Sequence, residues 1–203
     1  MKLIVGLGNP GSRYSDTRHN AGRLLIEDIA RREGLSFSRK KNLHASIVSA
    51  EWDGCEVILA FPHTYMNLSG TAVKSLLSHF EISPARDILV VVDDLALPFR
   101  RLRLRAKGSD GGHKGLRSIH ECLRTQDYAR LRLGIGMPEN ESRFEGLSYQ
   151  RGNAEAYVLS AFSAAEKKGL KDIFRRATET CRLWATQSIE AAMNSANQDT
   201  ETG

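Results

Sequence analysis

Polar side chains that can do acid–base chemistry follow or precede the apolar runs of this sequence. Asn9 and Asp93 each follow an apolar run, whereas His19, Asn67 and His113 each stand shortly before a segment with helical spacing. Functional groups of open α/β sheets gather where strands end and helices begin, so we expect these side chains to line one cleft. A histidine paired with a carboxylate is a common general base, because the acid fixes the tautomer and raises the basicity of the ring.

Other chemistries are poorly supported by the sequence. The three cysteines, Cys55, Cys122 and Cys181, are isolated from one another, and the patterns G-x-S-x-G, H-E-x-x-H and C-x-x-C are all missing. No nucleophile and no metal site is therefore expected, and direct activation of water by a histidine is the chemistry that the residues best allow. The remaining histidines are more simply explained as surface, turn or structural groups. Asn9 has an alternative explanation as a turn-former that bonds locally.

The segment Gly6–Gly11 matches the dinucleotide-binding pattern G-x-G-x-x-G. In that motif the third glycine opens a helix whose free N–H groups hold the pyrophosphate. Here Pro10 removes one donor, the helical spacing starts only near Asn20, and the acidic residue expected at the end of a second strand is absent. The sequence therefore argues against a nucleotide cofactor, and none is expected.

Positive charge is concentrated in one segment. The chain carries a net charge of +5, and residues 100 to 117 hold seven cations against the single acid Asp110. Arg101, Arg103 and Arg105 alternate with apolar residues, so in a strand all three leave the same face. Such a stripe is either solvated surface or a patch for phosphates or nucleic acid.

Periodicity predicts alternating strands and helices. Apolar runs and period-two patterns predict strands over 2–7, 46–51, 55–61, 88–92, 101–105 and 130–135, the second and third joined by an Asp53-Gly54 turn. Helical spacing predicts helices over 20–33, 73–80, 116–123, 154–162 and 164–192.

These elements predict a single globular α/β domain over residues 1–192, with a mixed twisted β-sheet flanked by helices and a C-terminal helix. A chain of 203 residues with 41% hydrophobic residues can bury one sizeable core. The polar stretch 137–153 is expected to be a mobile loop, and residues 193–203 a disordered tail.

The compartment is expected to be the cytoplasm. Charged residues interrupt every apolar run well short of a membrane span of about 18 residues, so no membrane association is expected. The first residues run into a predicted strand without a cleavage site, and the cysteines are odd in number and unpaired by pattern.

Six segments, in order and at the usual separations, together resemble the bacterial-type peptidyl-tRNA hydrolase family. The segments are GLGNPGSRYSDTRHNAG (6–22), FPHTYMNLSG (61–70), VVVDDLALP (90–98), GSDGGHKGLRSI (108–119), RLRLGIG (130–136) and YVLSAF (157–162). The resemblance implies a monomeric α/β globule without metal or organic cofactor. It also implies hydrolysis of the ester that joins a peptide to the 3′ ribose of a tRNA released prematurely from the ribosome, which recycles the tRNA.

The resemblance also implies residue roles. His19 would activate water and Asp93 would support it, whereas Asn9 and Asn67 would hold the peptide end and the hydrolytic water. Met66 and Tyr14 would contribute to the cleft wall and its ribose side, and His113 would lie in the same groove and bind substrate.

The resemblance gives the basic residues a partner. Arg103, Arg105, Lys107 and Arg132 become candidates for binding the phosphates of the tRNA acceptor stem. One position departs from the family, which commonly has G-G-H-N-G where this chain has Lys114 in place of the asparagine. An amide donates and accepts hydrogen bonds, but an ammonium only donates, so the role of Lys114 in substrate binding is open.

A second class of function is a non-catalytic RNA-binding relative of the splicing-factor type. Such a protein would keep the basic residues and lose the groups that activate water. Because His19, Asp93, Asn9 and Asn67 are all present, the sequence favours the enzyme.

Overall fold

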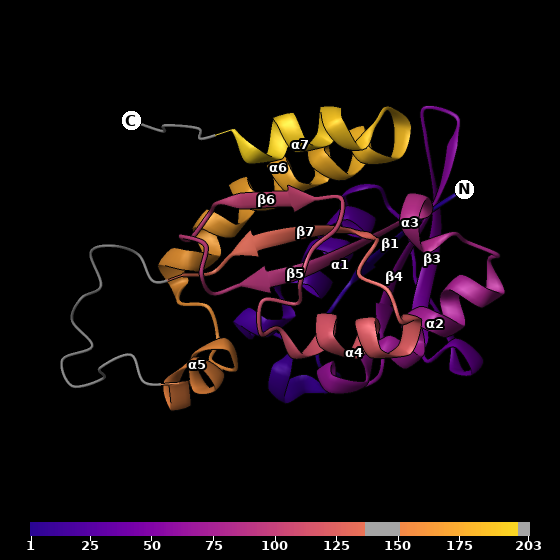
Figure 1. The fold of residues 1–203 in the computed structure, drawn as a ribbon. Helices are drawn as coiled ribbons and strands as arrows, with labels where there is room; N and C mark the ends of the chain where they lie inside the picture. Colours follow the sequence, from indigo (N-terminus) through magenta and orange to yellow (C-terminus); the bar gives the residue numbers. More distant parts are fainter. Residues whose placement is uncertain (137–150, 199–203) are drawn as a thin grey trace.

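The part of the chain that the computed structural model describes forms one seven-stranded sheet. The described residues are 1–136 and 151–198, with the backbone alone for 151–153. The strand order is β2-β3-β4-β1-β5-β7-β6 (Figure 1). The strands are β1 (Lys2–Gly6), β2 (Ser38–Lys40), β3 (Ala45–Trp52), β4 (Cys55–Pro62), β5 (Ile88–Asp94), β6 (Leu102–Arg105) and β7 (Ala129–Gly134).

The sheet is mixed, as the sequence predicted. The central strands β4, β1, β5 and β7 are parallel, and antiparallel strands complete the two edges. The parallel strands read as apolar runs because both of their faces are covered. Their carboxyl ends meet at one edge of the sheet, where Asp93 and Asp94 are the last residues of β5.

Helices cover both faces of this sheet, with α6 and α7 on one side and α2 and α4 on the other (Figure 1). The α-helices of the described residues are α1 (Ala21–Arg32), α2 (Ser69–His79), α3 (Pro84–Asp87), α4 (Lys114–Leu123), α5 (Arg151–Val158), α6 (Ala164–Thr186) and α7 (Ile189–Asn197). Single 3₁₀ turns are η1 (Ser12–Tyr14), η2 (Arg18–Asn20), η3 (Lys41–Leu43) and η4 (Met66–Leu68). Within the described ranges, none of the helices combines the length and the apolar character that crossing a membrane requires.

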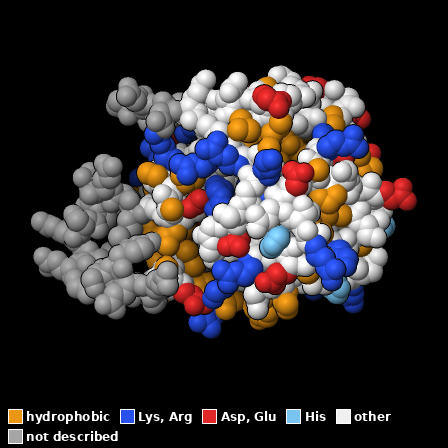
Figure 2. Space-filling view, viewed as in Figure 1, with side chains coloured by type: hydrophobic (Ala, Val, Ile, Leu, Met, Phe, Trp, Pro, Cys, Tyr) orange, Lys and Arg blue, Asp and Glu red, His pale blue; other side chains and the backbone are white. Residues whose placement is uncertain are grey.

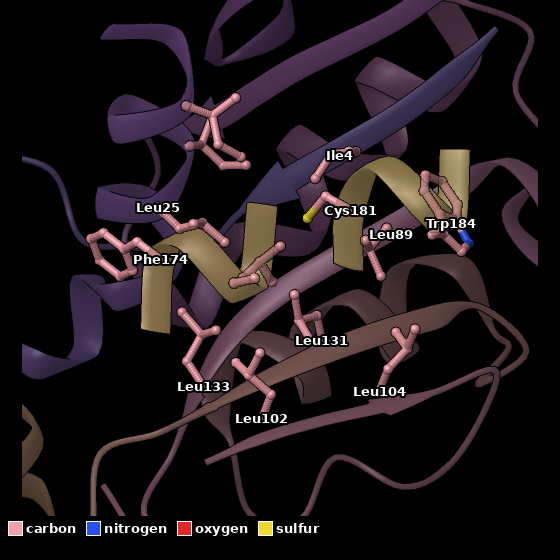
Figure 3. Close-up of a cluster of buried hydrophobic side chains, with 14 of the residues drawn as sticks. Ile4, Leu25, Leu89, Leu102, Leu104, Leu131, Leu133, Phe174, Cys181 and Trp184 are labelled. Atoms are coloured by element: carbon pink, nitrogen blue, oxygen red, sulfur yellow. The ribbon is translucent and has the colours of Figure 1, made fainter. Parts of the chain in front are cut away.

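Alternate residues of each central strand belong to two separate hydrophobic clusters. In β5, Leu89 and Val91 face the cluster that includes α6, whereas Val90 and Val92 face the cluster under α2 and α4. Figure 3 shows Phe174, Cys181 and Trp184 of α6 packed towards leucines of β5, β6 and β7. Burial raises the pKa of the Cys181 thiol to about 12, so this cysteine is an inert part of the core.

Two glycines let α1 approach the sheet closely. A Cβ atom on Gly22 would lie 2.3 Å from the carbonyl oxygen of Val91, and one on Gly6 would lie 2.3 Å from the carbonyl oxygen of Gly22. The start of α1 therefore sits directly on β1 and β5. The residues just before the helix, including His19, are thereby held above the end of β5.

The single helix predicted over 164–192 is wrong, because the structure has two helices there. Ser188 adopts an extended conformation and its side chain accepts a hydrogen bond from the backbone N–H of Ala191, so a new helix begins. This second helix, α7, extends to Asn197, and residues 193–197 are therefore not part of a disordered tail. Asn197 hydrogen-bonds both backbone groups of Leu104, at 2.8 and 3.1 Å, and thereby covers the edge strand β6.

Two predicted segments fall largely outside the described residues. Residues 137–150 of the expected loop and 199–203 of the expected tail are not described, so the predictions for them stay untested. Residues 151–153 of the expected loop are the first turn of α5, which begins three residues before its predicted start.

The close approach of α1 to the sheet predicts that Gly22→Ala is strongly destabilising. The added methyl group meets a backbone carbonyl that cannot move without shifting β5, so the free energy of unfolding should fall by about 3 kcal/mol. Urea denaturation measures this change. Arg31→Ala, on the exposed side of the same helix, should change stability by no more than about 0.5 kcal/mol. Equal stability of Gly22→Ala and the unsubstituted protein would contradict the close approach.

Candidate active site

A cleft of about 1310 Å³ opens at the carboxyl edge of the central strands. Its walls come from the turn after β1, the η4 turn, the end of β5, the glycine-rich segment before α4, and α5. Nine of the residues singled out from the sequence line it: Asn9, Tyr14, His19, Met66, Asn67, Asp93, His113, Lys114 and Arg132. The prediction that these segments converge on one cleft is therefore confirmed.

The carboxylate of Asp93 lies between two histidine rings. Its Oδ1 atom is 2.8 Å from Nδ1 of His19 and 3.1 Å from Nε2 of His113. All three side chains are buried, with exposed fractions of 3% for Asp93, 8% for His19 and 9% for His113. The two ring centroids are 4.9 Å apart. The three groups therefore form one interacting unit.

Hydrogen bonds to the backbone decide which nitrogen of His113 carries the proton. His113 is the N-cap of α4, and its Nδ1 atom accepts from the backbone N–H groups of Gly115 and Leu116. An imidazole nitrogen that accepts is unprotonated, so in the neutral ring Nε2 carries the proton and donates it to Asp93. His19 must likewise donate its Nδ1–H to Asp93. Its Nε2 atom then keeps a lone pair that can take a proton from water.

The environment of Asp93 keeps it ionised. Burial alone would raise the pKa of its carboxyl group, but the charges of His19 and His113 and the hydrogen bonds from both rings outweigh burial and lower the pKa. A permanently negative Asp93 stabilises the imidazolium that forms when His19 accepts a proton. This arrangement fits a general base rather than a group that must itself be protonated.

The same three side chains include the atom types that bind metal ions. In the described part of the chain they are the group of histidine and acidic residues whose possible ligand atoms all lie within 4.8 Å of one another. A metal needs a lone pair on each ligand nitrogen, but Nδ1 of His113 is engaged with two backbone N–H groups and Nε2 bears the proton. The donor set therefore fits a hydrogen-bonded carboxylate better than a metal ion.

Hydrogen bonds between Asn9 and Asn20 fix the wall of the cleft beside His19. The backbone N–H of Asn9 donates to Oδ1 of Asn20 at 2.7 Å, and Nδ2 of Asn20 donates to the carbonyl of Asn9 at 3.0 Å. Oδ1 of Asn9 accepts from the backbone N–H of Met66 at 2.8 Å, which identifies Nδ2 as the group left for a ligand. Asn9 is thus buried and oriented by two other segments, and the local turn-former explanation is not sufficient.

A buried ion pair holds the turn that carries His19. Arg18 precedes His19, and its Nη2 atom donates to both carboxylate oxygens of Glu166 at 2.7 and 2.6 Å. The guanidinium also lies 4.3 Å from the ring centre of Tyr157. These contacts attach η2 to the start of α6, so they position His19 without touching it.

Arg132 lines the cleft but is already paired. Its Nη1 atom donates to Oδ2 of Asp94 at 3.1 Å, and its Nη2 atom donates to the carbonyls of Ser109 and Asp110. With 13% of its side chain exposed, Arg132 holds the glycine-rich segment against β5.

The other three predicted phosphate-binding residues lie outside the cleft. Arg103 and Arg105 are exposed residues of β6 and alternate with the buried Leu102 and Leu104, as the period-two pattern predicted. Lys107 follows them in an exposed turn. Arg103 is opposite Arg132 in the β6–β7 ladder, so the stripe begins next to the cleft.

Lys114 has an acidic partner across the cleft. Its ammonium lies 2.8 Å from Oε1 of Glu155 in α5, and both side chains are more than half exposed. The hydrogen bond and charge of Lys114 lower the pKa of Glu155. In this conformation Lys114 therefore joins α4 to α5 and brings no unpaired charge to the cleft.

Sequence reasoning missed the residues that act through distant partners. Glu155 and Asn20 have no pattern that marks them, although Asn20 adjoins His19 in the chain. The pattern Ser163-x-x-Glu166 is typical of a helix capping box, but it does not predict the pairing of Glu166 with Arg18. Arg18 and Glu166 are 148 positions apart, and Lys114 and Glu155 are 41 apart. Only the arrangement of the elements brings such pairs together.

Known proteins match this chain over nearly its whole length. The model of the peptidyl-tRNA hydrolase family matches residues 3–202. The peptidyl-tRNA hydrolase of Chloroflexus aggregans is 44% identical over 197 residues, which are 97% of this chain and 99% of that protein. That of Cytophaga hutchinsonii is 43% identical over 195 residues, 96% of this chain and 97% of that protein. The solved structure from Acinetobacter baumannii has a TM-score of 0.85 at 32% identity and covers 97% of this chain and 94% of that one.

A histidine oriented by a buried carboxylate, on an α/β sheet of this topology, defines an enzyme of the hydrolase class. Because the family model and these relatives align over almost the whole chain, the assignment can be made more specific. The chain belongs to the peptidyl-tRNA hydrolase family. The family resemblance of the six sequence segments is thereby confirmed, and the enzyme is favoured over a non-catalytic relative.

The hydrogen bonds around Asp93 predict opposite tautomers for the two rings. In its neutral form, His19 should carry its proton on Nδ1, whereas neutral His113 should carry it on Nε2. Nitrogen-15 NMR of the histidine rings distinguishes the two forms through their long-range proton couplings. His79, exposed at the end of α2, provides an internal reference for a ring free to exchange tautomers. The same tautomer in both buried rings would contradict the arrangement.

Proposed function

We propose that this chain hydrolyses the ester bond between the peptide and the 3′ ribose of peptidyl-tRNA, with His19 as the general base. The observation that carries the proposal is the buried Asp93 carboxylate, which leaves Nε2 of His19 as the acceptor facing the cleft. The roles that the family resemblance implies are proposed for the same residues of this chain, because they line one cleft. The released tRNA then returns to aminoacylation.

The proposed reaction uses a water molecule as the nucleophile and His19 as the group that transfers a proton. Nε2 of His19 takes a proton from water as the hydroxide oxygen attacks the ester carbonyl. The tetrahedral intermediate then collapses, and its bond to the 3′ oxygen breaks. The imidazolium of His19, stabilised by Asp93, returns the proton to the departing 3′ oxygen, so the products are a free peptide and a tRNA with a 3′ hydroxyl. General-base assistance of this kind contributes about 10²- to 10⁴-fold to the rate.

Amide donors in the cleft would stabilise the negative charge on the ester oxygen. Nδ2 of Asn9 is fixed in place by the bonds of Asn9 to Asn20 and Met66, so little reorganisation is needed during the reaction. Asn67 is an exposed residue of the η4 turn on the same wall and would hold the peptide end. Each well-placed donor contributes about 3 kcal/mol to the transition state. Met66 and Tyr14 would form the apolar and ribose-facing walls.

The basic residues next to the cleft would bind the tRNA. Arg103, Arg105 and Lys107 are exposed and continue from the cleft along β6, which suits contacts to the acceptor-stem phosphates. Arg132 would contribute mainly by holding the glycine-rich segment, because Asp94 already balances its charge. Binding energy from this surface positions the ester and discriminates against small esters.

The chain is proposed to act as a monomer in the cytoplasm, without a metal, an organic cofactor or an obligate protein partner. The domain predicted over residues 1–192 is proposed to extend to Asn197, because residue 192 lies within α7.

Loss of His19 should abolish turnover while leaving tRNA binding intact. In single-turnover hydrolysis of N-acetyl-aminoacyl-tRNA with EDTA present, His19→Ala should lower the rate by about 10²- to 10⁴-fold, with a change in Kd for tRNA of less than about twofold. His79→Ala, which removes an exposed histidine, is the matched control and should retain full activity. A His19→Ala rate above about a tenth of that of the unsubstituted enzyme would remove His19 from the base role. Binding of tRNA without any hydrolysis by the unsubstituted protein would instead support the non-catalytic alternative.

Replacing Lys114 by the asparagine that the family commonly has at this position should have only a small effect on activity, because Lys114 is engaged in an exposed ion pair. Lys114→Asn should change kcat by less than about threefold, because an exposed ion pair contributes only about 0 to 1 kcal/mol. Glu155→Gln frees the ammonium of Lys114 and is the matched comparison in the same assay. A rise of tenfold or more in kcat for Lys114→Asn would show that the lysine impairs the water-activating groups.

A further inference from the structure

Arg130 of β7 is a charged side chain buried inside the protein. Only 1% of the residue is exposed, whereas other Lys and Arg side chains gather on the surface over the neighbouring strand β6 (Figure 2). Burial lowers the pKa of Arg130, and the charge of Arg132 acts in the same direction, but a guanidinium stays protonated in proteins. Arg130 is not among the residues that line the cleft. Its role is therefore separate from those already described.

A buried guanidinium is a costly way to fill space unless a carboxylate pairs with it. The charge of Asp110 reaches Arg130, but among the described residues no carboxylate forms an ion pair with this guanidinium. Its desolvation is then not offset by a contacting opposite charge, and an apolar side chain of similar volume would fill the position at lower cost. The hydrogen bonds of Arg130 show what an apolar side chain would not do.

Arg130 donates from its two terminal nitrogens to four backbone carbonyls. Nη1 donates to the carbonyls of Gly108 and Ser109, the latter at 3.1 Å. Nη2 donates to the carbonyls of Gln126 at 2.7 Å and Tyr128 at 3.3 Å. The planar guanidinium can serve carbonyls on two sides at once, whereas the donors of an ammonium group radiate from a single atom.

These carbonyls belong to both ends of one excursion of the chain. Residues 108–128, which we call the α4 segment, leave the sheet after β6, form α4 and return to β7 (Figure 1). Two of the four carbonyls stand at its start and two at its end. The backbone N–H of Gly108 also donates to the carbonyl of Gln126 at 3.4 Å, so the two ends lie side by side. Arg130 therefore holds the α4 segment at both ends.

Tyr128 connects Arg130 to the helix itself. The guanidinium lies 4.2 Å from the centre of the Tyr128 ring, which is fully buried. The hydroxyl of Tyr128 donates to the carbonyl of Leu116 in α4 at 3.4 Å. The first turns of α4 are thus attached to the same buried cation as the two ends of the segment.

The start of the α4 segment leads to His113 through shared carbonyls. The carbonyl of Ser109 accepts from both Arg130 and Arg132, at 3.1 and 3.0 Å. The carbonyl of Asp110 accepts from Arg132 at 3.3 Å and from the backbone N–H of His113 at 3.1 Å. The ring of His113 then donates to the buried carboxylate at the end of β5.

We propose that Arg130 is a positioning residue of the active site, which holds both ends of the α4 segment and thereby keeps the ring of His113 against Asp93. It acts through the backbone that it holds rather than on the reacting atoms. His113 is the N-cap of α4, so a shift of the helix moves the ring relative to β5. The effect on the rate rests on the proposed function, because it passes through the carboxylate that supports His19.

The test removes the guanidinium and follows the ring of His113. Arg130→Met fills a similar volume without charge or donors, and Arg130→Lys keeps the charge but presents its donors at a single point. The matched control is Leu131→Ala, at the next residue of β7, whose side chain packs in the cluster that includes α6. This control destabilises the protein through a cavity but leaves the hydrogen bonds to the α4 segment in place.

The first readout is the exchange of the Nε2 proton of His113 with solvent, measured by nitrogen-15 NMR well below the melting temperature of every variant. The exchange rate should rise on the order of tenfold in both Arg130 variants and stay unchanged in Leu131→Ala.

The second readout is single-turnover hydrolysis of N-acetyl-aminoacyl-tRNA. The rate should fall on the order of tenfold in both Arg130 variants, because a small displacement of a supporting group is enough to slow the chemistry. The Kd for deacylated tRNA should change by less than about threefold, because the exposed cations keep their charge. Leu131→Ala should retain the full rate.

The proposal requires both changes. An unchanged exchange rate or an unchanged rate of hydrolysis in the Arg130 variants would overturn it, as would a loss of tRNA binding that accounts for the slower reaction. An equal change in Leu131→Ala would also overturn it, because loss of stability alone would then explain the effect. If Arg130→Met does not fold, the two readouts on Arg130→Lys decide by the same criteria.

Failure of the proposed function would be visible separately. In that case the unsubstituted protein would not hydrolyse the tRNA ester at all. The proton exchange of His113 would still show whether Arg130 holds the ring against Asp93, because that readout does not depend on activity.

Discussion

The ionised carboxylate of Asp93 is the constraint around which the site is organised. It is buried at the end of a central strand, where an uncompensated charge would be very costly. The compensation comes from His19, which precedes α1, and His113, which caps α4. A single side chain thereby connects the sheet to helices on both of its faces. Because both rings must present a proton to the same oxygen, their tautomers and orientations are determined together.

Each neighbouring segment is in turn held by contacts that do not take part in chemistry. Gly22 allows α1 to rest on β5, and Arg18 ties the turn of His19 to Glu166. Asn9 and Asn20 exchange two hydrogen bonds that fix the adjacent wall. Catalysis by a positioned base and positioned amide donors depends on geometry held to a fraction of an ångström, and rigid elements with satisfied polar groups provide it.

Charge is divided between the cleft and the surface around it. Within the cleft, Arg132 is balanced by Asp94 and Lys114 by Glu155, so the ester would meet histidine and amide groups rather than unpaired cations. Outside it, Arg103 and Arg105 of β6 are exposed. Such a division suits an enzyme of a family that acts on tRNA, because binding energy from contacts remote from the reacting bond can be used to position the ester.

The sequence by itself determined the local elements and the composition of the site. Apolar runs located six of the seven described strands, period-two arginines predicted the exposed face of β6, and the position of Asp93 after an apolar run marked it as a strand-end carboxylate. The short strand β2 and the break before Ser188 escaped because three exposed residues and one capping side chain carry no periodic signal. Tertiary structure alone decided the strand order, the pairing of Arg132 with Asp94, and the contacts of Arg18 and Lys114 with acids far along the chain. Local patterns reflect backbone and burial preferences within a few residues, whereas these pairs depend on how whole elements pack against one another.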